Sequence, residues 1–293
     1  MTFLKYLFLR ITALLLRGLV RLQGKITSSP DAVNYIPSRD PQRKIKIHVY
    51  QPKHEVKGPV PVLINFHGSG YLIHAHGSDD AFCREVSQRT EYTVLDVSYR
   101  LSPENPFPAP IHDAEDVVRW VQEQPTLFDA SHIALSGFSA GGNIALVIAS
   151  TSFPKETFRS LLTFYPATEP CLDPATIAAP QAGGQPVPSL MLRIFRACYV
   201  QSDIDLRDPR ISPGLADPHS IPRNVLVVTA GYDSLADEGE RLGRSLQQDP
   251  DRHVVCERMD RCNHAWDKMA QKATREWELK CEAYNMAVEM LRL

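Results

Sequence analysis

Hydrophobic and polar positions alternate between two kinds of pattern from residue 43 onward. Short apolar runs rich in Val, Ile and Leu are separated by stretches whose apolar residues recur every three or four positions. The short runs are typical of strands buried on both faces, and the three-to-four spacing is typical of amphipathic helices. Strands that alternate with helices pair in parallel, so the pattern predicts an α/β fold with a doubly wound, mostly parallel sheet.

The expected elements follow from these two patterns. Buried strands are predicted at 60–67, 92–98, 132–137, 160–166 and 224–231, with a further strand at 253–259. Helices are predicted at 81–90, 112–124, 142–150, 234–248 and 274–293. The run Lys44–Tyr50 differs, because polar and apolar residues alternate strictly there, which predicts a half-exposed strand at the sheet edge.

Residues 167–221 break the alternation. They are rich in Pro and contain one apolar helical run, at 189–200. An irregular stretch of this length inside a compact domain is typically a lid and seldom a simple connection. We therefore expect 43–166 and 222–293 to form the core, with 167–221 inserted as a cap.

The N-terminal residues 1–25 are apolar but carry several cations. Arg10, Arg17 and Arg21 fall on one narrow stripe of a helix, and no uncharged run approaches the ~20 residues that span a bilayer. Three interpretations stay open: a helix packed on its own domain, an interfacial membrane helix, and a secretory or anchoring signal. We expect the packed helix, because the apolar core is short and no signal-cleavage pattern follows.

Composition narrows the classes of partner. The 293 residues hold 34 acidic and 32 basic side chains, a formal net charge of -2, which removes the electrostatic reason to expect nucleic acid. The six cysteines are scattered without metal-ligand spacing and are expected to be free thiols in a reducing compartment. We predict a cytoplasmic protein, the alternative being membrane association through 1–25, and the sequence leaves a homodimer open.

One cluster of small residues stands between a predicted strand and a predicted helix. The stretch Gly-Phe-Ser-Ala-Gly at 137–141 matches the G-x-S-x-G pattern, which presents a nucleophilic serine on a sharp strand-to-helix turn. Small neighbours let the backbone turn without a clash, and the following helix N-terminus stabilises developing negative charge. Ser139 is therefore the candidate nucleophile, and an ordinary glycine-rich connection is the plain alternative.

A serine hydroxyl needs a base, and the base needs a carboxylate to orient it. On this type of fold the order along the chain is serine, acid, histidine. Asp233 follows a late buried strand and is the expected acid, whereas Asp237 lies one turn into the next helix. His264 follows the last strand and is the expected base, whereas His253 opens that strand.

The loop after the first buried strand supplies candidate donors for an oxyanion hole. Its His-Gly-Ser-Gly run at 67–70 is a variant of the H-G-G-G loop, whose backbone N–H groups bind a tetrahedral oxyanion. We assign the N–H groups of Gly68, Ser69 and Ala140 to this role. A plain loop is the alternative.

These motifs together resemble the hormone-sensitive-lipase group of α/β-hydrolases, which are carboxylesterases and include arylacetamide deacetylases. The matching stretches extend over most of the chain: FHGSGY, DVSYRLSPENPFPAPIHDAEDVVRW, GFSAGGN, DPRISPGLAD, LVVTAGYDSLADEG and NHAW. The resemblance implies an α/β-hydrolase fold and scaffold roles for Arg100 and Glu104. It also implies a helical cap built from the N-terminal segment, 1–42, and from 167–221.

Three positions depart from the pattern of this group. Ser69 replaces a glycine of the oxyanion loop, Phe138 replaces the aspartate that commonly precedes the nucleophile, and Ala265-Trp266 replaces Gly-Phe after the histidine. None removes a catalytic group, but they bear on the shape of the acyl pocket. We expect Tyr71, Phe138 and Trp266 to line the substrate pocket.

The sequence thus predicts a serine carboxylesterase that acts on small, largely apolar acyl esters. It is expected to use no metal and no cofactor, and its partner is a small-molecule ester. The first alternative keeps the same three residues for lactone or amide hydrolysis, acyl transfer or dehydration. The second is a receptor-like binding module without catalysis, which the presence of His264 disfavours.

Overall fold

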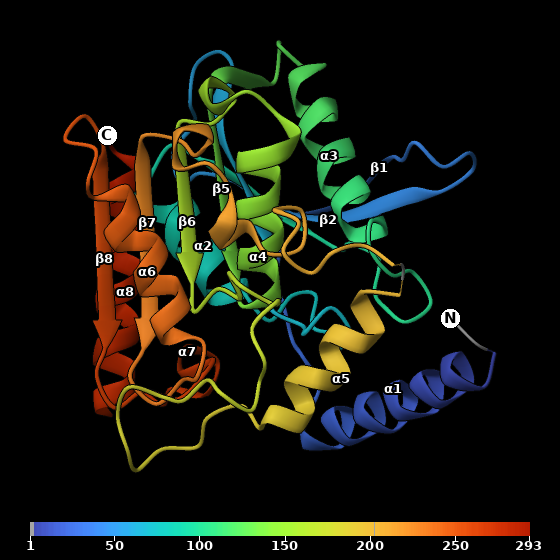
Figure 1. Cartoon of the computed structure of the whole chain (residues 1–293). Coiled ribbons are helices and arrows are strands. Elements are labelled where there is room, and N and C mark those ends of the chain that lie inside the picture. The colour runs from blue at the N-terminus through green and yellow to red at the C-terminus, as the bar shows by residue number, and fades with distance from the viewer. Residues whose placement is uncertain (1–2, 202) are drawn as a thin grey trace.

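The computed structural model describes residues 3–201 and 203–293, and these are built around one eight-stranded sheet. The strands lie in the order β1-β2-β4-β3-β5-β6-β7-β8, and all strands from β3 to β8 run parallel (Figure 1). The bounds are β1 Ala32–Pro37, β2 Lys44–Tyr50, β3 Val60–Phe66, β4 Thr93–Val97, β5 Phe128–Phe138, β6 Ser160–Phe164, β7 Asn224–Ala230 and β8 His253–Met259. The predicted doubly wound, mostly parallel sheet is confirmed.

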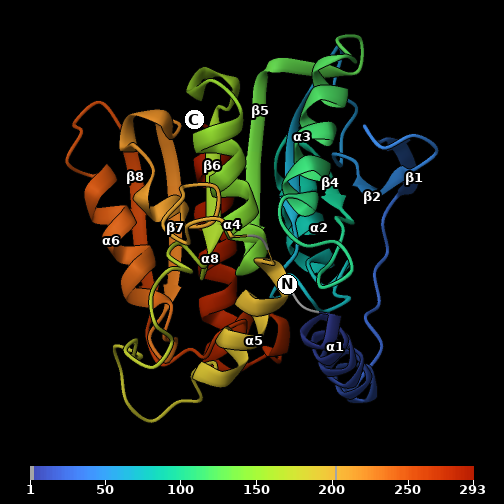
Figure 2. The same ribbon diagram turned by 45° about the vertical axis from the view of Figure 1, so that its right-hand side comes forward.

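Helices cover both faces of the sheet (Figure 2). One face packs against α3, α4 and α6, and the other packs against α2, α7 and α8. Their bounds are α2 Asp80–Arg89, α3 Ala109–Gln122, α4 Ala140–Val147, α6 Ala236–Leu246, α7 Trp266–Met269 and α8 Arg275–Leu291. The central strands are buried on both sides, which is the reason for their continuous apolar runs.

The edge of the sheet differs from the expectation. Lys44–Tyr50 was predicted to be a half-exposed edge strand, but β2 lies between β1 and β4 and is mostly buried. Strand β1, Ala32–Pro37, forms the edge and places Ile36 beside Ile45. The sequence pattern did not reveal β1, and its place in the sheet means that residues 1–42 do not belong to a cap alone.

Two helices lie at the end of the molecule where the parallel strands finish (Figure 1). They are α1, Phe3–Gln23, and α5, Ser189–Tyr199, the single α-helix among the described residues of 167–221. Leu9 and Ala13 of α1 are buried against Leu72 and Cys198. None of the described helices is long and apolar enough to cross a membrane.

Two arginines of α1, Arg17 and Arg10, reach the protein. Arg17 donates two hydrogen bonds of 2.9 Å to the Glu104 carboxylate, and it also donates to the carbonyl oxygens of Leu72 and Ser102. Arg10 lies 3.6 Å from the same carboxylate. Glu104 therefore holds the N-terminal helix onto the loop that follows β4, and the bond from Arg17 to Leu72 adds the loop that follows β3.

Arg100 has a comparable structural position. Its backbone N–H and its guanidinium both donate to the buried Asp113 carboxylate, and its Nη1 donates to Asp40 at 2.5 Å. These bonds join the loop after β4 to helix α3.

Candidate active site

Ser139 occupies the sharp turn between β5 and α4. Strand β5 ends at Phe138 and helix α4 begins at Ala140, so one residue makes the whole connection. The backbone of Ser139 has φ 52° and ψ −117°, a conformation that side-chain-bearing residues rarely adopt. A 2.9 Å hydrogen bond from its N–H to the Phe164 carbonyl holds the turn in place.

The glycines around Ser139 are required by close backbone approaches. A Cβ atom at Gly137 would lie 2.2 Å from the Gly141 carbonyl oxygen, and one at Gly141 would lie 1.9 Å from the Phe66 carbonyl oxygen. Both distances are far below van der Waals contact. The first turn of α4 is therefore pressed against the ends of β3 and β5, and this packing projects the serine side chain away from the sheet.

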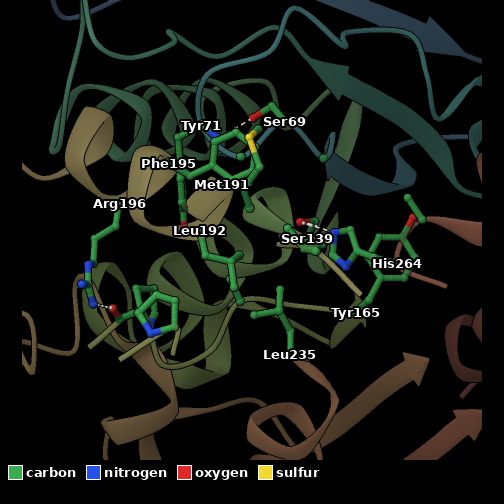
Figure 3. A pocket seen from close by; sticks show the side chains of 18 of the residues that line it. Ser69, Tyr71, Ser139, Tyr165, Met191, Leu192, Phe195, Arg196, Leu235 and His264 are labelled. Carbon is green, nitrogen blue, oxygen red and sulfur yellow. Dashed lines mark hydrogen bonds between the residues drawn. The ribbon is translucent and has the colours of Figure 1, made fainter. Parts of the chain in front are cut away.

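Three side chains from separate loops meet at this turn, and Figure 3 shows two of them, Ser139 and His264. The Nε2 atom of His264 lies 2.8 Å from the Oγ atom of Ser139, and its Nδ1 atom lies 2.6 Å from Oδ2 of Asp233. Asp233 follows β7 and His264 follows β8. Because β5, β7 and β8 are parallel, their carboxyl ends share one edge of the sheet, and that topology brings the three residues together.

The environment of His264 favours its charged form. Burial lowers the pKa of this imidazole, but the charge and hydrogen bond of Asp233 outweigh burial and leave the pKa raised above its ordinary value. Asp233 is fully buried, and its Oδ1 accepts a hydrogen bond from the N–H of Leu235. A proton accepted from Ser139 would therefore find a stabilised position on the ring.

The two competing residues of the sequence lie elsewhere. Asp237 is exposed in the first turn of α6, and His253 is exposed at the start of β8, the opposite end of that strand from His264.

The loop after β3 lies beside Ser139. Gly68, Ser69 and Ala140 line the same cavity as Ser139. Within the described chain, the N–H groups of Gly68 and Ser69 make no hydrogen bond, and Ala140 N–H is the first of its helix, where no partner exists within the helix. In the described chain, the three predicted donors thus have no partner of their own and line the same cavity as the serine.

The serine that replaces a glycine in this loop holds the loop in place. Its Oγ accepts a 2.9 Å hydrogen bond from the Tyr71 N–H and lies 2.7 Å from the Tyr99 hydroxyl oxygen. The Tyr99 hydroxyl in turn donates to the His67 carbonyl oxygen at 2.6 Å. Ser69 therefore contributes a side-chain anchor in addition to its backbone N–H.

A cavity of ≈ 640 Å³ opens over the serine (Figure 3). Its walls are mostly apolar. They include Ile73, Leu172, Ile177, Val187, Met191, Leu192, Phe195 and Leu235. Tyr71 lines it as expected, with its ring stacked 3.8 Å from the ring of Tyr199.

Phe138 and Trp266 do not line the cavity, contrary to the prediction. Phe138 is the last residue of β5 and points to the opposite face of the sheet from Ser139's helix, where its ring stacks 4.4 Å from that of Phe164. Trp266 is buried in the same core cluster, beside Tyr165. Both residues are close in sequence to a catalytic residue, but their side chains point into the packed core and not into the site.

Tyr165 and Glu238 are two of the cavity residues that sequence reasoning missed. Tyr165, just beyond β6, contacts the His264 ring with 4.8 Å between ring centroids. Glu238 of α6 is buried and accepts hydrogen bonds from the N–H groups of Thr168 and Glu169. Burial raises the pKa of Glu238 to about 8. Glu238 lies in the first turn of α6 beside the exposed Asp237, and no sequence pattern separates the two.

A buried ionic network lies behind His264. Lys268 is 2.8 Å from a carboxylate oxygen of Asp79 and 2.8 Å from one of Asp267, and its ammonium lies 3.5 Å from the centre of the Phe138 ring. Asp267 also accepts hydrogen bonds from the hydroxyls of Tyr165 and Tyr284. The network ties the histidine loop to the helices on that face.

Among the described residues, one group has the composition of a metal site. His48, His76 and Asp96 each place a ligand atom within 4.8 Å of the others. The rings of the two histidines lie 4.0 Å apart, and burial lowers the pKa of His76 to about 3. This group sits on the β2 and β4 side of the sheet, and none of its members lines the cavity over Ser139.

A strand-turn-helix serine, hydrogen-bonded to a histidine that is held by a buried carboxylate at the carboxyl edge of a parallel sheet, is the arrangement of the α/β-hydrolases. Comparison with known proteins agrees. The family model described as alpha/beta hydrolase fold matches residues 63–268. The chain belongs to this family.

Proteins of similar sequence include several named ester hydrolases. It is 32% identical to the carboxylic ester hydrolase LipN of Mycobacterium tuberculosis, over 65% of this chain and 53% of that protein. It is 31% identical to an ethyl acetate hydrolase of Pseudomonas putida, over 64% of this chain and 60% of that one. The matches thus span little more than half of these relatives.

Among solved structures, EstE1, a thermostable carboxylesterase cloned from a metagenomic library, superposes with a TM-score of 0.78 at 25% identity. The superposition covers 97% of this chain and 96% of that one. The resemblance to the hormone-sensitive-lipase group of carboxylesterases is confirmed.

Proposed function

We propose that this protein is a serine carboxylesterase that hydrolyses small, largely apolar acyl esters through Ser139, His264 and Asp233. The observation that carries the proposal is the continuous hydrogen-bonded relay from the Ser139 hydroxyl through both nitrogens of His264 to Asp233, at the floor of an apolar cavity. The esterase activities named for similar proteins support the same reaction.

The geometry supports a two-step reaction with a covalent acyl-enzyme. The Ser139 oxygen attacks the ester carbonyl carbon while Nε2 of His264 accepts its proton, and Asp233 stabilises the resulting imidazolium. The carbonyl oxygen takes up negative charge, which the N–H groups of Gly68, Ser69 and Ala140 would bind. Donors of this kind are each worth about 10²–10³ in rate.

Collapse of the first tetrahedral intermediate releases the alcohol, which receives the proton from Nε2 of His264. Water then attacks the acyl carbon and gives its proton to the same nitrogen. The acid leaves as that proton returns to the Ser139 oxygen. Each proton removed by His264 is thus returned within the cycle.

The cavity walls support an apolar substrate. An apolar acyl or alcohol group gains roughly 25 cal/mol for each Å² that it removes from water, and aliphatic and aromatic side chains surround the space above Ser139. The two Lys or Arg side chains that line the cavity in the described chain are engaged elsewhere. Lys268 pairs with Asp79 and Asp267, and Arg196 donates to the carbonyl oxygens of Pro170 and Leu172.

Covalent labelling and a chain-length series test the proposal together. A fluorophosphonate should form an adduct on Ser139, located by peptide mass spectrometry, and p-nitrophenyl esters should be hydrolysed, with kcat/KM depending on acyl length. The variant Ser139→Ala should lose the adduct and about 10⁶-fold in kcat. The variant Ser136→Ala, which changes a buried serine of β5, should retain both. A folded wild-type protein that forms no adduct and cleaves none of the esters would refute the function, and a receptor-like module would give that result.

A further inference from the structure

Helix α1 turns its apolar side to solvent. Its exposed positions recur every three or four residues and form one continuous face of the helix. Most of the exposed large hydrophobic side chains of the described chain lie on it. They are Phe3, Leu4, Leu7, Phe8, Ile11, Leu14, Leu15, Leu19 and Leu22. Phe8 and Leu15 are 64% and 65% exposed, against 4% for Leu9, so the face that packs on the protein is the narrower one.

This arrangement is the inverse of an ordinary surface helix. The most buried charged side chain of α1, Arg17, faces the protein and binds Glu104. Exposed apolar patches of this extent are rare on soluble proteins and mark interaction sites.

Charge around the apolar face has one sign. Residues 1–30 contain five Lys and Arg side chains and no acidic one. Arg21, in the last turn of the helix, and Lys25, just beyond it, are exposed. An apolar face bordered by cations is complementary to an anionic lipid surface, which offers acyl chains beneath negative headgroups.

The helix packs against part of the cavity wall. Leu9 and Ala13 of α1 belong to one packed cluster with Phe195 and Ile73, and those two side chains line the cavity over Ser139. Leu190 at the start of α5 and Met269 at the end of α7 are also exposed, and α1, α5 and α7 lie at the same end of the molecule (Figure 1).

We propose that the exposed face of α1 docks this protein on anionic membranes, with the helix lying in the plane of the lipid surface. The in-plane orientation follows from the bonds of Arg17, which fix α1 along the domain. A second copy is the other candidate occupant. A two-fold contact through the same face would place the cationic helices side by side, so repulsion disfavours that pairing.

Docking has a consequence for substrate access, which rests on the proposed esterase function. With α1 on the lipid and the cavity one side-chain layer away, esters dissolved in the membrane gain a short path to Ser139. Water-soluble esters do not depend on that path.

Vesicle sedimentation tests the docking without reference to activity. The full chain should sediment with vesicles of phosphatidylcholine mixed with phosphatidylglycerol and less with phosphatidylcholine alone. The double variant Phe8→Glu/Leu15→Glu should bind the mixed vesicles at least about tenfold more weakly, because two inserted side chains become charged. The control Leu127→Glu changes a comparably exposed leucine, 53%, that precedes β5 at the opposite end of the sheet, and it should bind like the wild type.

Circular dichroism melting checks that the variants are folded, and sedimentation equilibrium measures their oligomeric state. Equal vesicle binding by the wild type and the double variant would overturn the proposal. The proposal would also be overturned if the wild type were a dimer, the double variant a monomer, and neither protein bound the vesicles.

Two esters separate this proposal from the proposed function. The double variant should hydrolyse a water-soluble acetate ester at the wild-type rate and a vesicle-dissolved long-chain ester several-fold more slowly. If vesicles bind the wild type and neither ester is cleaved, docking stands and the esterase function fails. Equal loss on both esters would contradict the role of α1 in substrate access.

Discussion

The protonation of His264 is decided at the residue scale by two opposed effects. Burial disfavours the imidazolium, while the Asp233 carboxylate 2.6 Å from Nδ1 favours it. The carboxylate prevails, and the pKa is raised above the ordinary value. Since only the neutral imidazole can accept a proton from Ser139, the proposed activity should rise with pH through a pKa higher than that of a free histidine.

Replacing the carboxylate with an amide should alter both rate and pH dependence. In Asp233→Asn the charge that raises the pKa of His264 is gone and burial remains, so the acidic limb of the kcat/KM profile should move to lower pH. The amide also favours the wrong imidazole tautomer, and kcat should fall about 10⁴-fold. A pH series of p-nitrophenyl acetate hydrolysis measures both. Asp237→Asn, an exposed acid four residues further on, should leave the limb in place, and an unmoved limb in Asp233→Asn would contradict the assignment.

At the scale of elements, helix α1 is held by a small set of polar contacts. Arg17 bridges Glu104 and two carbonyl oxygens, whereas only Leu9 and Ala13 of the helix are fully buried hydrophobic residues. The helix therefore depends on one guanidinium for much of its attachment. Its removal leaves the partly buried Glu104 carboxylate with only the more distant Arg10.

Arg17→Ala should detach α1. We expect the free energy of unfolding to fall by about 1–3 kcal/mol, since a hydrogen-bonded charge pair is lost. Trypsin should also cleave at Arg21 faster than in the wild type. Urea denaturation and timed proteolysis measure the two effects, and Arg10→Ala, which removes only the 3.6 Å partner of Glu104, is the matched control. Equal stability and equal cleavage of Arg17→Ala and the wild type would show that the apolar contacts suffice.

Across the whole molecule, Lys268 links parts of the chain that are distant in sequence. It pairs with Asp79, next to the start of α2, and with Asp267 of α7, whose carboxylate also binds the hydroxyls of Tyr165 and Tyr284. The pairing raises the pKa of Lys268 although burial lowers it, so the ammonium stays charged.

Lys268→Met should destabilise the whole fold. The substitution leaves two buried carboxylates without a cation, and breaking a buried ion pair from one side typically costs about 3–5 kcal/mol. Urea denaturation gives the change directly. Lys272→Met, four residues later and exposed, should change the free energy of unfolding by less than about 0.5 kcal/mol. A variant at 268 as stable as the one at 272 would show that the network contributes no net stability.

Sequence patterns predicted the sheet well where burial is complete. The strands β3 to β7 have apolar residues on both faces, so their runs are unmistakable, and the serine, acid and histidine follow three of the parallel strands. Edge pairing was harder to predict. Strand β1 has four exposed or half-exposed residues before the buried Ile36, and it resembles a loop until its partner is known.

The amino-acid sequence by itself determined the order of the elements, the serine turn and the three residues proposed to act there, because burial and backbone conformation restrict residue type locally. Only the tertiary structure decided which side chains line the cavity and which side of α1 meets solvent. Phe138 and Trp266 are adjacent to active-site positions, yet their side chains point into the core. Arg17 faces inward because it binds Glu104, which lies 87 residues later in the sequence. Such directions depend on distant partners, and a partner's position is set only when the chain has folded.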